Sequence, residues 1–350
     1  MAAFATHRWT RCQAELSVLP APKTQVDSGE SPVIPTRLTA ALGIEQPVLL
    51  APMDKVADAR LASAVSAAGG LGLLGGGYCD REWLDEQLAS VSRRVGCGFI
   101  TWCLARNPEL LDVALDHDPA AVFLSFGDPM PFADRIHDSG VPLLCQVCTV
   151  EEARRALDAG ARVLVAQGGE AGGHGTGTRS TLTLVPELAD LLAARSPDTL
   201  LVASGGVADG RGLAAALCLG ADGVLMGSRL WASTEAAVSA AAQRRALASS
   251  GDDTVRQSVY DIVRAVDWPS HYTGRVLRND FVRQWHGHEQ KMREDLPRLQ
   301  EVFKNAKDND DYSIGNVIVG EAIGLIDELE PVKAIIDRVV REASSILVPT

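Results

Sequence analysis

The feature that most constrains this chain is a repeated alternation of two sequence patterns between residue 47 and about residue 250. Short apolar runs, often β-branched, are each followed by a longer Ala- and Leu-rich stretch with helical spacing, which is typical of βαβ units and a parallel sheet. Eight such units in about 200 residues match the count and length of an α/β fold of the (β/α)8 (TIM) barrel type. The expected strands are 48–51, 71–74, 98–101, 122–125, 143–147, 163–166, 201–203 and 224–226, and the expected helices are 57–68, 81–92, 108–117, 131–139, 150–159, 184–194, 211–219 and 234–247.

An open, doubly wound sheet is the competing architecture for this pattern. That fold usually has fewer strands and carries its glycine-rich loop after the first strand. Here the first expected strand runs into Ala51-Pro52-Met53, which has no glycine, whereas glycine-rich loops follow the sixth, seventh and eighth strands. Barrel phosphate sites lie after the last strands, so the sequence favours a barrel with its active site at the C-terminal ends of the strands.

Three segments are expected along the chain. Residues 1–34 are irregular and rich in Pro, Ser and Thr, and we interpret them as a leader. Residues 35–250 hold the barrel. Residues 251–350 begin as a polar segment and end in an amphipathic stretch over 332–347, which predicts a mostly helical C-terminal extension that packs on the barrel.

Composition limits the partners of the protein. The formal net charge of −12 argues against nucleic acid and anionic membrane surfaces, because both require a basic face. No apolar run reaches the roughly 18 residues of a membrane span, and no secretory signal is recognisable. Seven cysteines, scattered mainly through apolar segments, suit a reducing compartment. We therefore expect a cytoplasmic protein with a small-molecule substrate, and the oligomeric state stays open, with a homodimer as one option.

Two of the cysteines, Cys145 and Cys148, form a C-x-x-C pair. The redox form of this motif places its first cysteine at a helix N-terminus, where the thiol is activated. Both residues lie instead in or just after the apolar run 142–147. The sequence therefore favours a structural role for the pair.

The loop after the sixth strand is the most informative stretch. A buried strand is expected to end at Gln167 and to open into residues 168–178, which contain six glycines and His174. Glycines let the backbone approach a ligand closely and expose its N–H groups. A histidine at the active-site face can act as a base or a hydrogen-bond donor near neutral pH. The alternative is a flexible loop whose histidine is solvated.

Two further loops predict a phosphate site. The seventh strand ends in Ser204-Gly205-Gly206 before a helix, and the eighth ends in Met226-Gly227-Ser228. Backbone N–H groups at such strand-to-helix turns carry partial positive charge and bind phosphate. At the end of the first strand, Met53 is soft and apolar and could pack against a flat ring, although alone this pattern is more typical of a core.

At these residues the sequence resembles the nitronate monooxygenase (formerly 2-nitropropane dioxygenase) family of FMN-dependent barrels. The blocks that carry the resemblance are 51–53 with 67–75, 167–174, 203–212 and 220–228, joined by 320–326. The resemblance covers most of residues 47–347.

The resemblance implies FMN as the cofactor and no metal. The residues implied to lie at the flavin ring are Ala51, Pro52 and Met53, with Gly75 and Thr101 nearby. The residues implied to contact the rest of FMN, including its phosphate, are Gln167, Gly172, Gly173, Ser204, Gly205, Gly206, Met226, Gly227 and Ser228. His174 matches the catalytic histidine of the family. The implied reaction oxidises an alkyl nitronate with O2 to a carbonyl compound and nitrite, and His174 would deprotonate a neutral nitroalkane.

Two stretches depart from the family pattern where substrate would lie. Asp54-Lys55 follows Met53 where many relatives have small residues, and residues 99–102 replace a more usual strand end. The first alternative is therefore a reductase on the same scaffold, which would use NAD(P)H to reduce an enoyl-acyl thioester or a quinone. A sugar-phosphate isomerase or aldolase is disfavoured, because no strand end offers a clear Lys base apart from Lys55. A non-catalytic binding barrel is the third alternative.

Overall fold

The computed structural model describes residues 33–348, so nearly all of the leader expected over 1–34 lies outside the described residues. Its main sheet has eight parallel strands in the order β1-β9-β8-β6-β5-β4-β3-β2. A parallel bridge between Leu49 and Leu71 joins the two ends of this order, so the sheet closes into the expected barrel. The strands are β1 Val48–Leu50, β2 Leu73–Gly75, β3 Gly96–Ile100, β4 Val122–Ser125, β5 Leu143–Val147, β6 Val163–Gln167, β8 Leu200–Ser204 and β9 Gly223–Met226.

The strands are buried on both faces, which explains why they read as continuous apolar runs. Alternate side chains point into the barrel, where Leu49, Phe123 and Val165 belong to one apolar cluster. Their neighbours along the strands point outward and pack under the helices. Leu38 of α1 (Arg37–Leu42) joins the inner cluster, so this short helix contributes to filling the barrel interior.

Helices follow the strands at the places the sequence predicts, and several begin at side-chain caps. Asp58, Asp80, Thr149 and Asp209 each accept a backbone N–H from the first turn of the following helix. The helices are α2 Ala59–Ala67, α3 Arg81–Ser90, α5 Glu109–Leu115, α6 Met130–Asp138, α7 Val150–Asp158, α8 Thr181–Arg195 and α9 Gly210–Cys218. A short extra helix, α4 (Thr101–Leu104), begins at Thr101, which was expected to end a strand.

The helix expected over residues 234–247 differs from the structure. The chain after β9 forms α10 (Ser228–Trp231), then turns, and is helical again only in α11 (Ala240–Leu247), which Ser239 caps. The position beside α9 and α2 is occupied by α16 (Val332–Leu347), whose apolar face is buried. Periodicity alone does not reveal whether α11 or α16 completes the ring of helices around the barrel, because both helices carry an apolar face.

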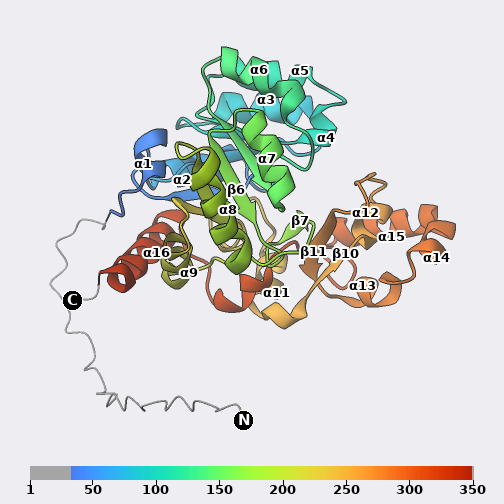
Figure 1. The fold of residues 1–350 in the computed structure, drawn as a ribbon. Coiled ribbons are helices and arrows are strands. Elements are labelled where there is room, and N and C mark those ends of the chain that lie inside the picture. The colour runs from blue at the N-terminus through green and yellow to red at the C-terminus, as the bar shows by residue number, and fades with distance from the viewer. Residues whose placement is uncertain (1–32, 349–350) are drawn as a thin grey trace, which may run out of the picture. The chain divides into compact units, whose positions relative to one another are not determined.

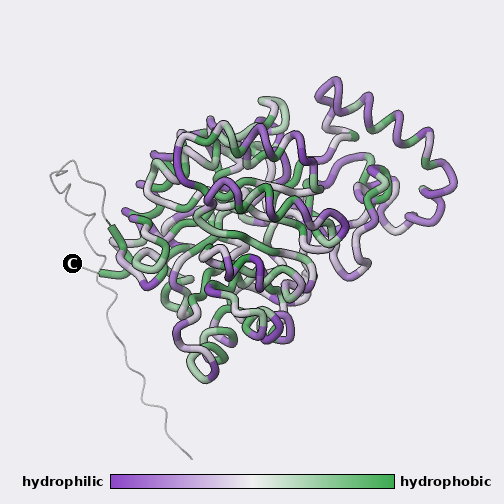
Figure 2. The backbone as a smooth tube through the Cα atoms, turned by 90° about the horizontal axis from the view of Figure 1, so that it is seen from above, coloured by the Kyte–Doolittle hydropathy of each residue, from purple (hydrophilic) through white to green (hydrophobic). Residues whose placement is uncertain are grey.

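Residues 251–331 form an insertion between α11 and α16 (Figure 1). Strands β10 (Thr254–Gln257) and β11 (Thr273–Leu277) form an antiparallel sheet whose third strand is β7 (Gly173–Gly175) of the glycine-rich loop. The other elements are η1 Gly251–Asp253, α12 Val259–Val263, α13 Asp280–Trp285, α14 Glu289–Glu294, α15 Leu296–Asp308 and η2 Glu321–Leu325. The outer helices are largely hydrophilic, whereas the strands at the barrel centre are hydrophobic (Figure 2).

Among residues 33–348, no helix has the length and apolar character needed to cross a bilayer.

The packing of α16 gives a test of its role in the barrel. Ile336 is fully buried against the barrel layer, whereas Ile346 on the same helix is 48% exposed. We expect Ile336→Ala to lower the free energy of unfolding by about 2–5 kcal/mol, because it leaves a cavity. Ile346→Ala should change it by about 0.5 kcal/mol or less, as is usual at surface positions. Urea unfolding of both variants checks this, and equal losses would contradict the structural role of α16.

Candidate functional site

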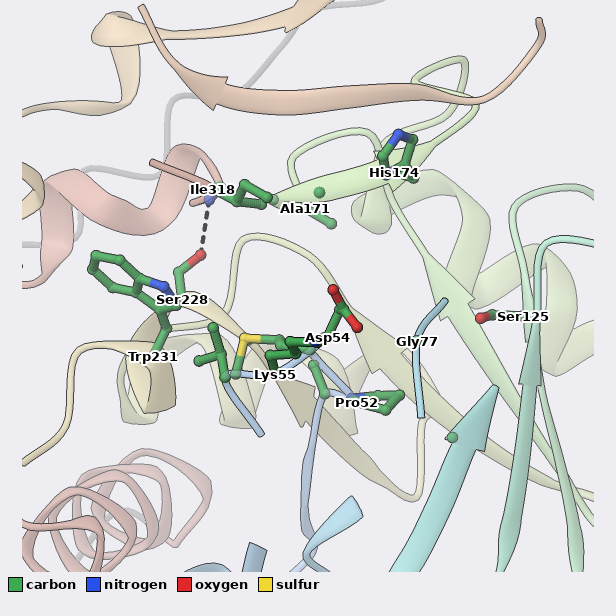
Figure 3. Close-up of a pocket in the computed structure, with 18 of the residues that line it drawn as sticks. Pro52, Asp54, Lys55, Gly77, Ser125, Ala171, His174, Ser228, Trp231 and Ile318 are labelled. Carbon is green, nitrogen blue, oxygen red and sulfur yellow. Dashed lines mark hydrogen bonds between the residues drawn. The ribbon is translucent and has the colours of Figure 1, made fainter. Parts of the chain in front are cut away.

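A cavity of about 460 Å³ lies at the C-terminal ends of the barrel strands and extends under the insertion (Figure 3). Most of the residues that the sequence predicted for the site come together around it. Those that line the cavity are Ala51, Pro52, Met53, Gln167, Gly172, Gly173, His174, Ser204, Gly205, Gly206, Gly227 and Ser228.

Three predicted residues do not line the cavity. Gly75 lies behind the lining of the cavity, and a Cβ atom added at this position would overlap the carbonyl of Met53. Thr101 is buried at the start of α4. Met226 points into the layer between strands and helices, and its neighbour Leu225 lines the cavity instead, because side chains alternate along a strand. Gly75 and Met226 therefore support the wall from outside.

One wall of the cavity is the segment from Ala51 to Met53. This segment follows β1 directly, at the point where backbone pairing between β1 and the neighbouring strand β9 ends. Ala51 N donates to the carbonyl of Met226, and Pro52, which has no N–H, ends the pairing. A Cβ at Gly98 of β3 would overlap the ring of Pro52, so glycine is needed there for the close contact. Close packing of this kind fixes an apolar wall at the strand ends.

The glycine-rich loop forms the opposite wall and is held in place by two arginines of the insertion. Arg256 donates to the carbonyls of Gly169, Ala171 and Gly175, and Arg275 donates to Gly169. Burial, and then the charge of Arg275, lower the pKa of Arg256 to about 10. These bonds satisfy carbonyls that would otherwise need water. The loop is therefore a fixed part of the site, in contrast to the flexible alternative.

His174 is held by residues of the insertion. Its Nε2 lies 3.0 Å from both carboxylate oxygens of Asp261, and its ring stacks on Trp268 with centroids 3.6 Å apart. The side chains of His174 and Asp261 are only 13% and 9% exposed. Gln167 Nε2 also donates to the carbonyl of His174 at 3.0 Å. This arrangement leaves Nδ1 as the ring nitrogen without a hydrogen bond to any described residue.

Sequence reasoning missed Asp261 and the contact role of Trp268. Both lie more than 85 residues after His174, in a segment whose pattern gave no strand or motif. The pairing depends on β11 lying beside β7, which places Gly274 opposite His174. No local signal in the sequence encodes that register, because a three-residue glycine-rich strand lacks the alternation that predicts strands.

The two predicted phosphate loops lie next to each other across the parallel pair β8 and β9. Gly205 and Gly206 have φ values of 107° and 77°, which only glycine adopts readily. The amides of Gly205, Gly206 and Gly227 have no acceptor among the described residues. Ser228 Oγ accepts the amide of Gly320 at 2.8 Å, as the dashed line shows, and its own O–H is free to donate (Figure 3). These groups form a cradle of donors that suits an anion.

The departures from the family pattern lie at the rim of the cavity. Lys55 and Asp54 both line it, but Lys55 forms an exposed salt bridge with Asp80 at 2.9 Å. Burial raises the pKa of Asp54, and the charge of Arg264 partly offsets this effect. Trp102 packs edge-on against Tyr78 and Trp268. We call this group of charged and aromatic side chains the rim of the cavity.

Comparison with known proteins gives consistent matches. The family model described as nitronate monooxygenase matches residues 35–114 and 100–342. A nitronate monooxygenase of Neurospora crassa is 33% identical over 85% of this chain and 89% of its own length. A carboxyl-CoA dehydrogenase of Mycobacterium tuberculosis is 33% identical over 71% of this chain and 67% of its own. The structure of FabK from Thermotoga maritima superposes with a TM-score of 0.75, at 30% identity, over 90% of this chain and 97% of its own.

The C-x-x-C pair gives a test that uses pH. Burial raises the pKa of Cys145 to about 12 and that of Cys148 to about 11, so both remain thiols at neutral pH. Iodoacetamide at pH 8 should label exposed Cys218 and leave these two unmodified, because only the thiolate reacts. Peptide mass spectrometry of the native and the urea-unfolded protein measures this. Rapid native labelling of Cys148 would favour the redox interpretation.

Proposed function

Because the chain belongs to the nitronate monooxygenase family, a family of oxidoreductases, we propose that it oxidises alkyl nitronates with O2 to a carbonyl compound and nitrite, with FMN as cofactor. The observation that carries the proposal is the placement of His174 at the cavity wall, bonded to Asp261 and stacked on Trp268. A buried imidazole that is held in one orientation at the cavity wall is suited to moving a proton from carbon.

The residues around the cavity fit FMN. A phosphate suits the cradle, because the amides of Gly205, Gly206 and Gly227 lack acceptors there. A Cβ at Gly206 would meet only side-chain atoms of Glu170, at 3.7 and 3.9 Å, so the space above this glycine is open. The carboxylate of Glu170 is bonded to Thr181. The volume of about 460 Å³ lies within the range of about 300–1,000 Å³ that is usual for cofactor and ligand sites.

Residues Ala51 to Met53 would hold the flat ring, and Ser228 with the three glycine amides would hold the phosphate. Bound FMN would supply electron acceptance from the nitronate and reactivity with O2. Side chains of the protein would carry out the proton transfer. Asp261 accepts the Nε2 proton of His174, which fixes the tautomer, so Nδ1 is the atom that takes the proton from the α-carbon of a neutral nitroalkane.

A second candidate is an NAD(P)H-dependent flavin reductase acting on enoyl-acyl thioesters or quinones. The similarity to the carboxyl-CoA dehydrogenase of Mycobacterium tuberculosis favours this alternative. Docking of an acidic carrier protein would need a basic patch, and residues 283–293 form a basic run in the insertion. There Arg283 pairs with Asp280, and His286 lies 3.4 Å from Glu289. Because the family model and relatives that cover most of the chain are nitronate monooxygenases, we rank nitronate oxidation first.

An anaerobic absorbance spectrum of the purified protein separates the candidates. Loss of a flavin band on addition of propionate 3-nitronate would support the proposed reaction. Loss of the band only with NADH or NADPH would move the function to the reductase. If the protein has no flavin band and takes up no added FMN, the cofactor assignment is wrong.

The His174–Asp261 pair gives a prediction for catalysis. We expect His174→Ala to retain FMN but to lower turnover of a neutral nitroalkane about 100- to 10,000-fold, the usual contribution of a general base. Asp261→Asn should lower it as well, because the tautomer of His174 is no longer fixed. Turnover of the preformed nitronate should fall much less in both variants.

The matched control for this prediction is His271→Ala, which changes an exposed histidine of the same insertion that does not line the cavity. Steady-state rates with nitroethane and ethyl nitronate, corrected for flavin content, give the comparison. Unchanged nitroethane turnover in His174→Ala would remove this residue from the mechanism.

A further inference from the structure

A cation that the mechanism above does not use faces the cavity close to His174. Arg264 follows the last residue of α12, is half-buried and lines the cavity. Its guanidinium carbon lies 4.8 Å from the ring centroid of Tyr78, and its Nη1 lies 3.5 Å from the Tyr78 hydroxyl oxygen. Within residues 33–348 no carboxylate forms a salt bridge with it. Because a guanidinium carries five N–H donors, most of the hydrogen-bonding capacity of Arg264 is left for a ligand.

Tyr78 supplies a second donor at the same place. Its hydroxyl oxygen accepts the Nε1 proton of Trp268 at 3.0 Å and the weaker bond from Arg264. The hydroxyl proton of Tyr78 has no acceptor in the described part of the chain. Burial raises the pKa of Tyr78, so the hydroxyl stays protonated and can donate. Two different groups thus present N–H and O–H donors to the same part of the cavity.

The other charged groups around this point are engaged elsewhere. Asp261 is bonded to His174, and Lys55 is paired with Asp80. Asp54 is the remaining acid near Arg264, and burial raises its pKa, which weakens it as a counter-ion. In the aromatic surroundings of Tyr78, Trp102 and Trp268, a cation that forms no salt bridge within residues 33–348 favours binding of an anion.

A nitronate group matches these donors. It is planar, carries one negative charge and shares that charge between two oxygens, as a carboxylate does, and a guanidinium binds such groups with two parallel hydrogen bonds. We propose that Arg264 and Tyr78 form the subsite that binds the nitronate oxygens. This inference rests on the proposed function. Both residues bind and position the substrate, while His174 handles the proton.

The location of the subsite is consistent with separate roles for Arg264 and Tyr78 in substrate binding and for His174 in proton transfer. Trp268 stacks on His174 on one side and donates to Tyr78 through its Nε1. A single indole ring therefore contacts both the proton-handling group and the anion subsite. Trp268 also fixes the orientation of the two groups relative to each other.

The test uses sodium propionate as an unreactive planar anion and follows tryptophan emission at constant ionic strength, which requires no turnover. We expect saturable binding by the wild-type protein. Arg264→Gln should weaken it about 10- to 100-fold, the usual range for hydrogen bonds to a charged group. Tyr78→Phe should weaken it less, and Arg264→Lys should give an intermediate value, because charge remains but the paired geometry is lost. Arg106→Gln is the matched control, since Arg106 also stacks on a rim tryptophan, at 4.9 Å, but does not line the cavity.

A kinetic measurement completes the test. In Arg264→Gln, the KM for ethyl nitronate should rise by a factor similar to the loss in propionate binding, while flavin content is unchanged and kcat changes by less than about threefold. Unchanged propionate binding in Arg264→Gln, or no saturable binding by the wild-type protein, would overturn the subsite. If the wild-type protein does not oxidise nitronates, the proposed function fails, and propionate binding still decides whether Arg264 and Tyr78 form an anion site.

Discussion

The pairing of β7 with β11 is the interaction on which the candidate site depends. A loop with six glycines has little intrinsic preference for any one conformation, and it cannot by itself hold a histidine in a fixed position. Three backbone pairs, with His174 opposite Gly274, convert the middle of that loop into a strand of a small sheet. Arg256 and Arg275 then bind its carbonyls. The insertion thereby provides both the support for His174 and its partner Asp261.

The candidate site is built from residues of two parts of the structure, the barrel and the insertion. The barrel fixes the strand ends, the apolar wall from Ala51 to Met53 and the cradle of glycine amides, all of which are set by buried parallel strands. The insertion contributes Asp261, Arg264 and Trp268, which surround His174 and Tyr78. Proteins similar to this chain are named for different activities, so the barrel alone does not define the chemistry.

The sequence predicted the barrel because each strand is buried on both faces and each helix carries its own apolar stripe. These signals are local, and the same is true of the glycines at the strand ends, which is why Gly205, Gly206 and Gly227 were identified before the structure. Gly75 and Met226 were expected at the cofactor from the family resemblance. The structure places the Met226 side chain under the helices and the backbone of Gly75 against Met53, and both placements depend on strand register and packing, which the resemblance does not give.

The residues that sequence reasoning missed share one property. Asp261, Arg264 and Trp268 reach the site only through contacts between segments some 85 to 190 residues apart, such as the bond from Trp268 to Tyr78. The misplaced eighth helix has the same cause, since α11 and α16 both have an amphipathic pattern and only packing against α9 and α2 distinguishes them. Local patterns thus identify elements, and long-range packing decides which element fills a given position.

The placement of α16 has a consequence for how the protein is made. The ring of helices around the barrel closes only when α16 packs between α9 and α2, and this helix follows the whole insertion in the chain. During synthesis, the strands, the glycine-rich loop and the insertion all leave the ribosome before the ring can be completed. A nascent chain that ends within the insertion lacks α16, so the faces of α2 and α9 that α16 covers in the complete fold stay exposed. All the elements of the candidate site are therefore synthesised before the helix that completes the outer layer of the barrel.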